Sequence, residues 1–110
     1  MQDEVGGLEV FDRAEGTWFP VEPVSGALVV NLGDLMARWT NDKYSSTLHR
    51  VVSPTGDKDR YSVVFFLMGE PDYEIECLPS CLGDGEEPKY KAITVGEHLM
   101  NRVMETYAAK

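Results

Sequence analysis

The sequence predicts a mainly β fold, a sandwich or barrel, that ends in a single α-helix. Short runs of β-branched and aromatic residues recur along the chain and are separated by Gly, Pro, Asn and Asp. Five or six strands at this spacing are typical of a sandwich or barrel. Residues 94–110 instead carry a helical apolar period. A chain of 110 residues, 43% of them hydrophobic, is long enough for one modest core.

The first half of the chain contains three strand patterns. "GLEVF" (7–11) alternates apolar and polar residues, and "TWFPV" (17–21) follows the turn signal "AEG". "SGALVVNLGD" (25–34) is a β-branched run bounded by glycines, which predicts a third strand. "DLMARWTND" (34–42) fits either a helical turn or an irregular strand, because its apolar residues are too few to decide.

The second half contains two more strand patterns and the helix. "STLHRVV" (46–52) and "RYSVVFFLM" (60–68) flank the turn-forming segment "SPTGDKD" (53–59). Thr94 and Glu97 have the spacing of a capping box, which predicts a helix that begins there. Its apolar face would pack on the sheets and consists of Leu99, Val103 and Met104.

Composition and charge narrow the functional classes. Ten basic and nineteen acidic residues give a net charge of −9, which disfavours nucleic acid and anionic membrane surfaces as partners. The longest apolar run, residues 63–68, is far shorter than the roughly 20 residues of a membrane span. The acidic N-terminus lacks the pattern of a signal peptide, so we expect a soluble, cytoplasmic protein. Cys77 and Cys81 are expected to be reduced thiols on a loop rather than half of a zinc site.

Three polar residues stand out on the later strand patterns. His49 is one of two histidines and would share a strand face with Thr47 and Val51. Taken alone, such a histidine is more often hydrogen-bonded than bound to a metal. Arg60 and Ser62 would share another face, where the guanidinium could pair with a carboxylate while the hydroxyl donates to it. The alternative for Arg60 is a solvated charge at the start of a strand.

The order of four segments resembles the C-terminal half of the isopenicillin N synthase-like 2-oxoglutarate/Fe(II)-dependent dioxygenases. The segments are "QDEVGGLEV", "GTWFPVEPVSGALVVNLGDLMARWTNDKYSSTLHRVV", "RYSVVFFL" and "YKAITVGEHLMNRVMETY". The resemblance implies that residues 1–93 form part of a double-stranded β-helix, or jelly roll. It also implies that residues 94–110 form a C-terminal helix that packs on this domain.

The resemblance also implies a metal site and a carboxylate site. In the family an H-x-D motif supplies two iron ligands and a later histidine the third, which His49 resembles. Arg60 and Ser62 match the R-x-S motif, which in most members binds the distal carboxylate of 2-oxoglutarate. In isopenicillin N synthase itself that motif holds a substrate carboxylate, so both assignments stay open. The implied cofactor is Fe(II), with 2-oxoglutarate as cosubstrate and ascorbate as a further candidate.

The implied function is oxidation of a small organic substrate coupled to decarboxylation of 2-oxoglutarate. The 110 residues contain no H-x-D, which the family places just before "QDEVGGLEV". We therefore expect the isolated chain to be inactive and to need the missing N-terminal half of the fold or another copy of itself. Two alternatives are a degenerate, non-catalytic carboxylate-binding or interaction module and a structural homo-oligomer.

Other residues of the resembling segments are expected to be structural. Asn31 to Asp34, "NLGD", match a turn motif and are assigned a scaffold role. Trp39, Phe65 and Phe66 are expected in the core, with Phe66 as the best exception because it shares a strand face with Arg60. His98 has no matching ligand role and is expected to be a partly exposed helix residue. These assignments leave the predicted chemistry with His49, Arg60 and Ser62.

Overall fold

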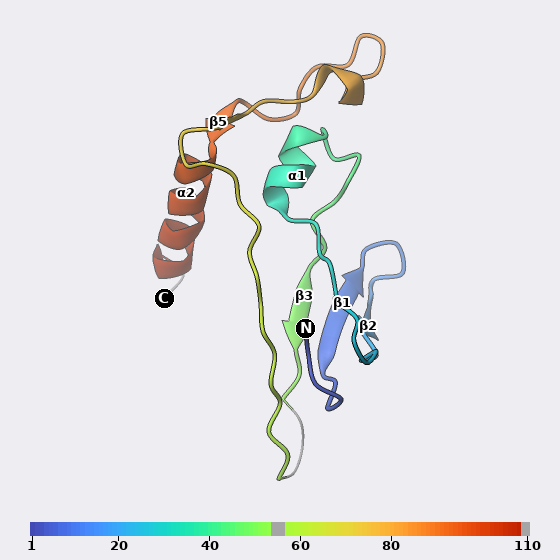
Figure 1. The fold of residues 1–110 in the computed structure, drawn as a ribbon. Helices are drawn as coiled ribbons and strands as arrows, with labels where there is room; N and C mark the ends of the chain where they lie inside the picture. The colour runs from blue at the N-terminus through green and yellow to red at the C-terminus, as the bar shows by residue number, and fades with distance from the viewer. Residues whose placement is uncertain (54–56, 109–110) are drawn as a thin grey trace. The chain divides into compact units, whose positions relative to one another are not determined.

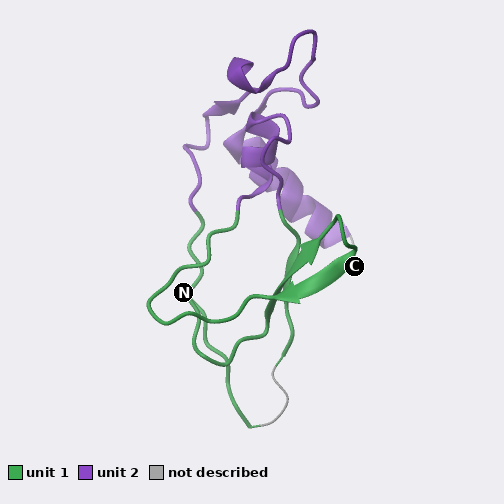
Figure 2. Cartoon of the chain, turned by 90° about the vertical axis from the view of Figure 1, so that its right-hand side faces the viewer, with its two compact units in different colours: residues 1–31, 47–66 green, residues 32–46, 67–110 purple. Residues whose placement is uncertain are grey.

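The computed structural model describes residues 1–53 and 57–108. Part of the predicted turn, residues 54–56, and the last two residues, 109–110, lie outside the described residues. The described chain divides into two compact units (Figure 2). Unit 1 comprises residues 1–31 and 47–66, and unit 2 comprises residues 32–46 and 67–110.

Unit 1 is built on a three-stranded antiparallel sheet with the order β2-β1-β3 (Figure 1). The strands are β1 (Leu8–Asp12), β2 (Thr17–Pro20) and β3 (His49–Val51). The predicted strands at 7–11 and 17–21 are thereby confirmed, and the one at 46–52 is confirmed in a shorter form.

The β1–β2 hairpin is closed by the side chain that ends β1. Asp12 Oδ1 accepts hydrogen bonds from the amides of Ala14 (2.7 Å) and Glu15 (3.2 Å). The amide of Gly16, at φ +66°, donates to the Asp12 carbonyl at 2.9 Å. An aspartate that bonds its own following amides and a glycine in the left-handed region are what a tight turn needs. The turn signal in the sequence therefore has a direct structural cause.

Cross-strand pairs place two neighbouring residues of β3 on opposite faces. His49 pairs with Val10, whereas Arg50 pairs with Glu9. Successive residues of a strand point to opposite faces of the sheet. Arg50 Nε lies 2.7 Å from Glu9 Oε2, and its guanidinium lies 4.1 Å from the ring centroid of Trp18. Arg50 thus stabilises one face, and His49 projects from the other.

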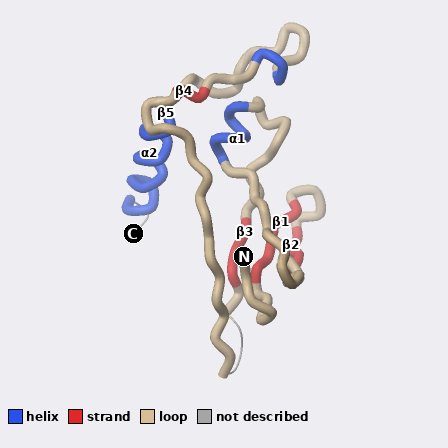
Figure 3. Tube along the Cα trace, viewed as in Figure 1, coloured by secondary structure: helices blue, strands red, loops and turns tan. Residues whose placement is uncertain are grey.

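Two predicted strands, 25–34 and 60–68, are wrong for this structure. Residues 25–33 form no strand and belong to the loop that follows β2 (Figure 3). In the described part of the chain the second run makes one bridge, between Ser62 and Gln2. β-Branched sequence favours extended backbone, but a strand also requires a partner edge to bond to. Among the described residues neither segment has such an edge along its length. Phe65 and Phe66 are 84% and 74% exposed, so the prediction that they belong to the core is also wrong.

Unit 2 contains two helices and a small two-stranded sheet. The helices are α1 (Asp34–Trp39) and α2 (Val95–Ala108), and the sheet pairs β4 (Glu74–Ile75) with β5 (Ile93–Thr94). The helical alternative for residues 34–42 is therefore confirmed. A 3₁₀ turn (Pro79–Cys81) follows β4.

The capping box at the start of α2 is present as the sequence predicts. Glu97 N donates to Thr94 Oγ1 at 3.1 Å, and Thr94 N donates to Glu97 Oε2 at 3.2 Å. These two bonds satisfy amides that the helix itself leaves without partners. His98 in the next turn is half-buried, as expected. The predicted apolar face of α2 is largely exposed, since Val103 and Met104 are 49% and 60% exposed.

The core of unit 2 is small. Its buried apolar residues are Ala37, Ile75, Cys77 and Val95, of which Val95 is fully buried. Trp39 is half-buried and packs edge-on against Tyr73, with ring centroids 6.2 Å apart. The two thiols are both unpaired. In the part of the chain that the structure describes, no helix has the length and apolar character needed to cross a membrane.

Candidate functional site

All three residues singled out for chemistry lie in unit 1. His49 begins β3, whereas Arg60 and Ser62 lie on the segment that pairs with the first residues of the chain. The predicted neighbourhood of Arg60 and Ser62 is confirmed, because Arg60 Nη1 donates to Ser62 Oγ at 3.2 Å. No hydrogen bond among the described contacts joins His49 to either of them. The candidate site therefore has two parts. One is the imidazole of His49 on the sheet, and the other is the guanidinium of Arg60 on a later segment of the chain.

The imidazole of His49 has its Nδ1 nitrogen directed at two polar groups. The carbonyl oxygen of Thr47 lies 3.1 Å from Nδ1, and Nδ2 of Asn31 lies 3.4 Å from it. The side chain is exposed, and Nε2 makes no hydrogen bond in the described part of the chain. An exposed imidazole anchored through one nitrogen can offer the other to a metal or a substrate.

Asn31 is a contact that the sequence reasoning missed. The sequence predicts a scaffold turn that contains both Asn31 and Asp34, but the structure gives these two residues different partners. Asn31 lies beside His49 in unit 1. Asp34 begins α1 in unit 2, where its carboxylate bonds Arg102 of α2. The spacing of "NLGD" carries no signal for the contact with His49, because 18 residues separate the two side chains.

The guanidinium of Arg60 is held by three acceptors. Nε donates to the carbonyl oxygen of Gly6 at 2.6 Å, and Nη2 donates to Gln2 Oε1 at 3.0 Å, in addition to the bond to Ser62. The Gln2 amide is oriented by a long bond from its Nε2 to the carbonyl of Val21, 3.5 Å away. A guanidinium has five N–H groups, so three bonds fix its plane and leave two donors for a ligand. Sequence reasoning did not identify Gln2 or Gly6.

The backbone conformation of two glycines presents the Gly6 carbonyl oxygen to Arg60. Gly6 and Gly7 have φ values of +78° and +90°, a region that side chains disfavour. A Cβ on Gly7 would lie 2.6 Å from the carbonyl oxygen of Val52 and 3.7 Å from Cδ of Arg60. The backbone must therefore approach closely at this point. The pattern "VGG" could have indicated a tight turn, but its partner across the chain is a tertiary contact.

The first residues of the chain pair with the Arg60 segment. Met1 N and the carbonyl of Val63 are 3.1 Å apart, and Asp3 N donates to the carbonyl of Tyr61 at 3.1 Å. The amide of Tyr61 in turn donates to the Asp3 carboxylate, and this bond lowers the pKa of Asp3. This pairing sets the orientation of the residues that flank Arg60.

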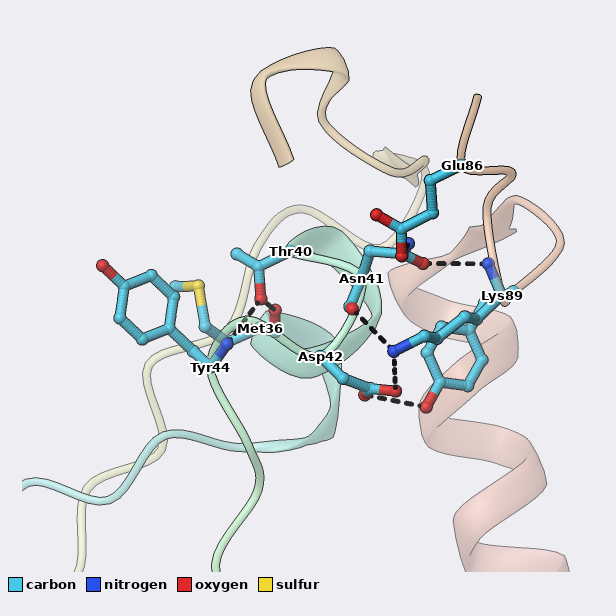
Figure 4. Close-up of polar contacts among 8 residues, drawn as sticks. Met36, Thr40, Asn41, Asp42, Tyr44, Glu86 and Lys89 are labelled. Carbon is cyan, nitrogen blue, oxygen red and sulfur yellow. Dashed lines mark hydrogen bonds and ion pairs between the residues drawn. The ribbon is translucent and has the colours of Figure 1, made fainter. Parts of the chain in front are cut away.

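A second polar cluster lies in unit 2 and is structural in character (Figure 4). Asn41 is 4% exposed and has a positive φ of +52°. Its Nδ2 donates to Glu86 Oε1 at 2.9 Å, and its Oδ1 accepts the amide of Lys89 at 2.9 Å. Asp42, also at positive φ, accepts a bond from the hydroxyl of Tyr90, which raises the pKa of Tyr90. Asn41 and Asp42 thus fasten the end of α1 to the segment before β5.

The described residues contain no group of three or more His, Cys, Asp or Glu side chains placed to hold a metal ion. His49 can supply one nitrogen ligand, and a transition metal at this position would need further ligands from elsewhere. His98 has a pKa below its ordinary value because burial penalises its charged form. It lies in unit 2, and His49 in unit 1. The described residues of unit 1 thus offer one imidazole ligand and one guanidinium that is held by hydrogen bonds.

The profile described as the 2OG-Fe(II) oxygenase superfamily matches residues 1–69. The "2-oxoglutarate-Fe(II) type oxidoreductase hxnY" of Emericella nidulans is 50% identical over 107 residues, which cover 97% of this chain and 30% of that protein. The "2-oxoglutarate-dependent dioxygenase citB" of Monascus ruber is 43% identical over 110 residues, covering 100% and 32%. The chain thus spans about a third of the length of these relatives.

Solved structures show the same relationship. A full-length Neurospora crassa protein in complex with alpha-KG and thymine superposes with a TM-score of 0.85 at 39% identity, over 96% of this chain and 33% of that one. A 2OG-Fe(II) oxygenase family protein from Caulobacter crescentus gives a TM-score of 0.82 at 42% identity, over 94% and 35%. A dioxygenase for auxin oxidation in rice gives 0.77 at 26% identity, over 96% and 36%.

Proposed function

Because this chain belongs to the 2OG-Fe(II) oxygenase superfamily, we propose that it forms the C-terminal part of the catalytic domain of a 2-oxoglutarate/Fe(II)-dependent dioxygenase. Residues 1–93 would contribute strands to a double-stranded β-helix, and residues 94–110 the helix that packs on it. The match of nearly the whole chain to about a third of each relative supports its assignment to one part of a longer protein.

The observation that carries the proposal is that three hydrogen bonds orient the guanidinium of Arg60 before any ligand binds. Its plane is fixed by Gly6, Gln2 and Ser62, and two N–H donors remain. A carboxylate accepts two parallel N–H bonds from such a fork, and a pre-oriented fork loses little side-chain entropy on binding. Arg60 would therefore bind the distal carboxylate of 2-oxoglutarate, with the Ser62 hydroxyl as a further donor. Family membership suggests 2-oxoglutarate as the cosubstrate, and the geometry of Arg60 and Ser62 explains how they would bind its carboxylate.

His49 would supply one ligand to Fe(II). Its exposed imidazole, anchored through Nδ1, fits the role of a nitrogen ligand. When bound, Fe(II) would supply the activation of dioxygen that couples decarboxylation of 2-oxoglutarate to oxidation of a small organic substrate. The remaining protein ligands would come from the part of the fold that this chain does not contain. Ascorbate would act as a reductant outside the site.

The proposal is tested by transplanting this chain into its relative from Emericella nidulans. The 110 residues replace the matching third of hxnY, and succinate formation from 2-oxoglutarate is measured with Fe(II), ascorbate and a substrate that supports turnover by unmodified hxnY. We expect turnover by the chimera and none by the isolated chain. His49→Ala in the chimera should abolish turnover and reduce the iron content. A folded chimera that binds iron without forming succinate, or an isolated chain that turns over through His49, would contradict the proposal.

A second candidate is a carboxylate-binding module without catalysis. It is favoured by one observation: the Arg60 site is formed, whereas the described residues contain no complete set of metal ligands. In that case the isolated chain would bind 2-oxoglutarate without a metal, and Arg60→Ala would abolish binding. Calorimetric titration of the isolated chain with 2-oxoglutarate, with and without Fe(II) under anaerobic conditions, separates the two functions.

A further inference from the structure

The imidazole of His49 faces two groups that cannot both be satisfied by one protonation form. In a neutral imidazole one nitrogen carries the proton and the other a lone pair. If Nδ1 is protonated, it can donate to the carbonyl of Thr47, but it then faces the N–H groups of Asn31. If Nδ1 has the lone pair, Asn31 can donate to it, but the Thr47 carbonyl oxygen then faces that lone pair at 3.1 Å.

One of these two neighbours is fixed and the other can turn. The backbone next to Thr47 is held to β1, because Phe11 N donates to the carbonyl of Leu48 at 2.9 Å. The Asn31 side chain is exposed, and the described contacts include no other bond that holds its amide in one orientation. The oxygen and nitrogen of a carboxamide exchange places by a half-turn, and their assignment follows from the surrounding hydrogen bonds. The fixed carbonyl oxygen of Thr47 therefore favours a proton on Nδ1 of His49, and the Asn31 amide can turn its own oxygen toward the same N–H.

We propose that Asn31 is a positioning residue that reinforces the Nδ1–H tautomer of His49, which the Thr47 carbonyl favours. With its Oδ1 turned to the ring, Asn31 joins the Thr47 carbonyl in accepting from Nδ1–H. The proton is then held on Nδ1, and the lone pair of Nε2 remains free. A metal ligand needs that free lone pair. The use of the tautomer for iron rests on the proposed function, whereas the tautomer itself does not.

As an acceptor for Nδ1–H of His49, Asn31 would have a role beyond that of a turn residue. Loss of one net hydrogen bond to Nδ1–H should reduce the ratio of the Nδ1–H to the Nε2–H tautomer roughly two- to tenfold. A carboxylate at position 31 presents only acceptor oxygens and should preserve or increase the ratio. An alanine at that position presents neither an acceptor nor a donor. The pair Asn31→Asp and Asn31→Ala therefore separates hydrogen bonding from simple space filling.

The test is nitrogen NMR of histidine in the metal-free chain. The chain is labelled with ¹⁵N-histidine in a His98→Gln background, so that His49 is the single imidazole, and magic-angle spinning gives spectra even of an associated sample. The pH is set to about 8.5, above the ordinary pKa of histidine. In the parent and in Asn31→Asp, we expect the signal of an unprotonated nitrogen to come from Nε2. In Asn31→Ala, we expect a lower ratio of the Nδ1–H to the Nε2–H tautomer. Asn101→Ala, an exposed asparagine of α2, is the matched control and should leave the ratio unchanged.

Each remaining outcome overturns the proposal. A parent chain protonated on Nε2, or an unchanged ratio in Asn31→Ala, would show that Asn31 does not reinforce the Nδ1–H tautomer. Loss of the β1–β3 pairing in the parent would remove the fixed carbonyl and with it the inference. If Asn31→Ala loses that pairing, Asn31→Asp decides, and a lower ratio there contradicts the proposal. A correct tautomer together with an inactive chimera would instead count against the proposed function alone.

Discussion

Arg60 Nε donates to the carbonyl oxygen of Gly6 across 2.6 Å, although 54 residues separate them in the sequence. This bond leaves the ends of the guanidinium for other partners and fixes the plane in which a carboxylate must approach. Lysine would keep the charge but lose the fork and the bond to Gly6.

The first prediction concerns that fork. In the chimera, Arg60→Lys should raise the KM for 2-oxoglutarate by roughly 10- to 100-fold, the equivalent of one or two charge-assisted hydrogen bonds. Initial rates at varied 2-oxoglutarate and at saturating substrate measure it. Arg50→Lys is the matched control, because Arg50 contacts Glu9 and Trp18 on the sheet face opposite His49, and the KM of this variant should change little. A change confined to the KM of the substrate would assign Arg60 to the substrate carboxylate.

The second prediction concerns Gly7. Alanine there combines a disfavoured φ with a Cβ 2.6 Å from the Val52 carbonyl oxygen, so the backbone must shift. We expect a loss of about 2 to 4 kcal/mol in the free energy of unfolding. Gly16→Ala is the control, since Gly16 has φ +66° but nothing within 4 Å of its Cβ, and about 1 kcal/mol is expected. Urea denaturation measures both, and equal losses would refute the steric argument.

The third prediction concerns the buried Asn41. Asn41→Ala removes the acceptor of the Lys89 amide and the donor to Glu86, and it leaves alanine at positive φ. The free energy of unfolding should fall by about 2 to 4 kcal/mol. Asn41→Gly also removes these hydrogen bonds, but glycine adopts a positive φ without strain. Its free energy of unfolding should therefore fall by less than that of Asn41→Ala. Hydrogen exchange at the Lys89 amide reports the local effect, and unchanged protection in both variants would contradict the role of the cluster.

The fourth prediction concerns pH. Burial lowers the pKa of His98, so between its folded pKa and about 6.5 the unfolded chain binds more protons. Stability should therefore fall as the pH drops through about 6.5, and His98→Gln should remove this dependence. The urea midpoint at pH values of about 7.5 and 5.5 measures the effect.

Asp34 provides a contrast in a different pH range. Burial opposes ionisation of its carboxyl, but hydrogen bonds from Ser46 and Arg102 lower its pKa overall. A lowered acid pKa contributes stability that is lost only below about 4. Asp34→Asn should therefore change the acid limb of the profile. Because the Asp34 carboxylate also raises the pKa of His98 against the effect of burial, the same substitution should lower the pKa of His98 further. A profile of His98→Gln identical to that of the parent would refute the assignment.

The fifth prediction concerns association of the isolated chain. Phe65 and Leu67 are 84% and 89% exposed within the apolar run 63–68, and exposed apolar runs with unpaired backbone favour self-association. Phe65→Ser should lower the weight-average mass in sedimentation. Tyr107→Ser is the control, because Tyr107 is 70% exposed on α2 but lies outside this run. A monomeric parent with well-protected amides at 60–68 would refute the prediction.

The sequence by itself determined what depends on local spacing and on the family pattern. Alternation predicted β1 and β2, and Thr94 with Glu97 predicted the start of α2, because these signals act over a few residues. The order of the motifs identified the family. Arg60 and Ser62 were expected to meet because residues two apart on an extended chain share a face.

Tertiary structure alone decided which partners those residues have. Gly6 and Gln2 meet Arg60 through contacts 54 and 58 residues apart, and Asn31 meets His49 across 18 residues. Residues 25–33 and 63–68 have strand composition but no strand, because a strand forms only where a second edge satisfies its amides and carbonyls. Propensity is a property of a segment, whereas pairing is a property of two.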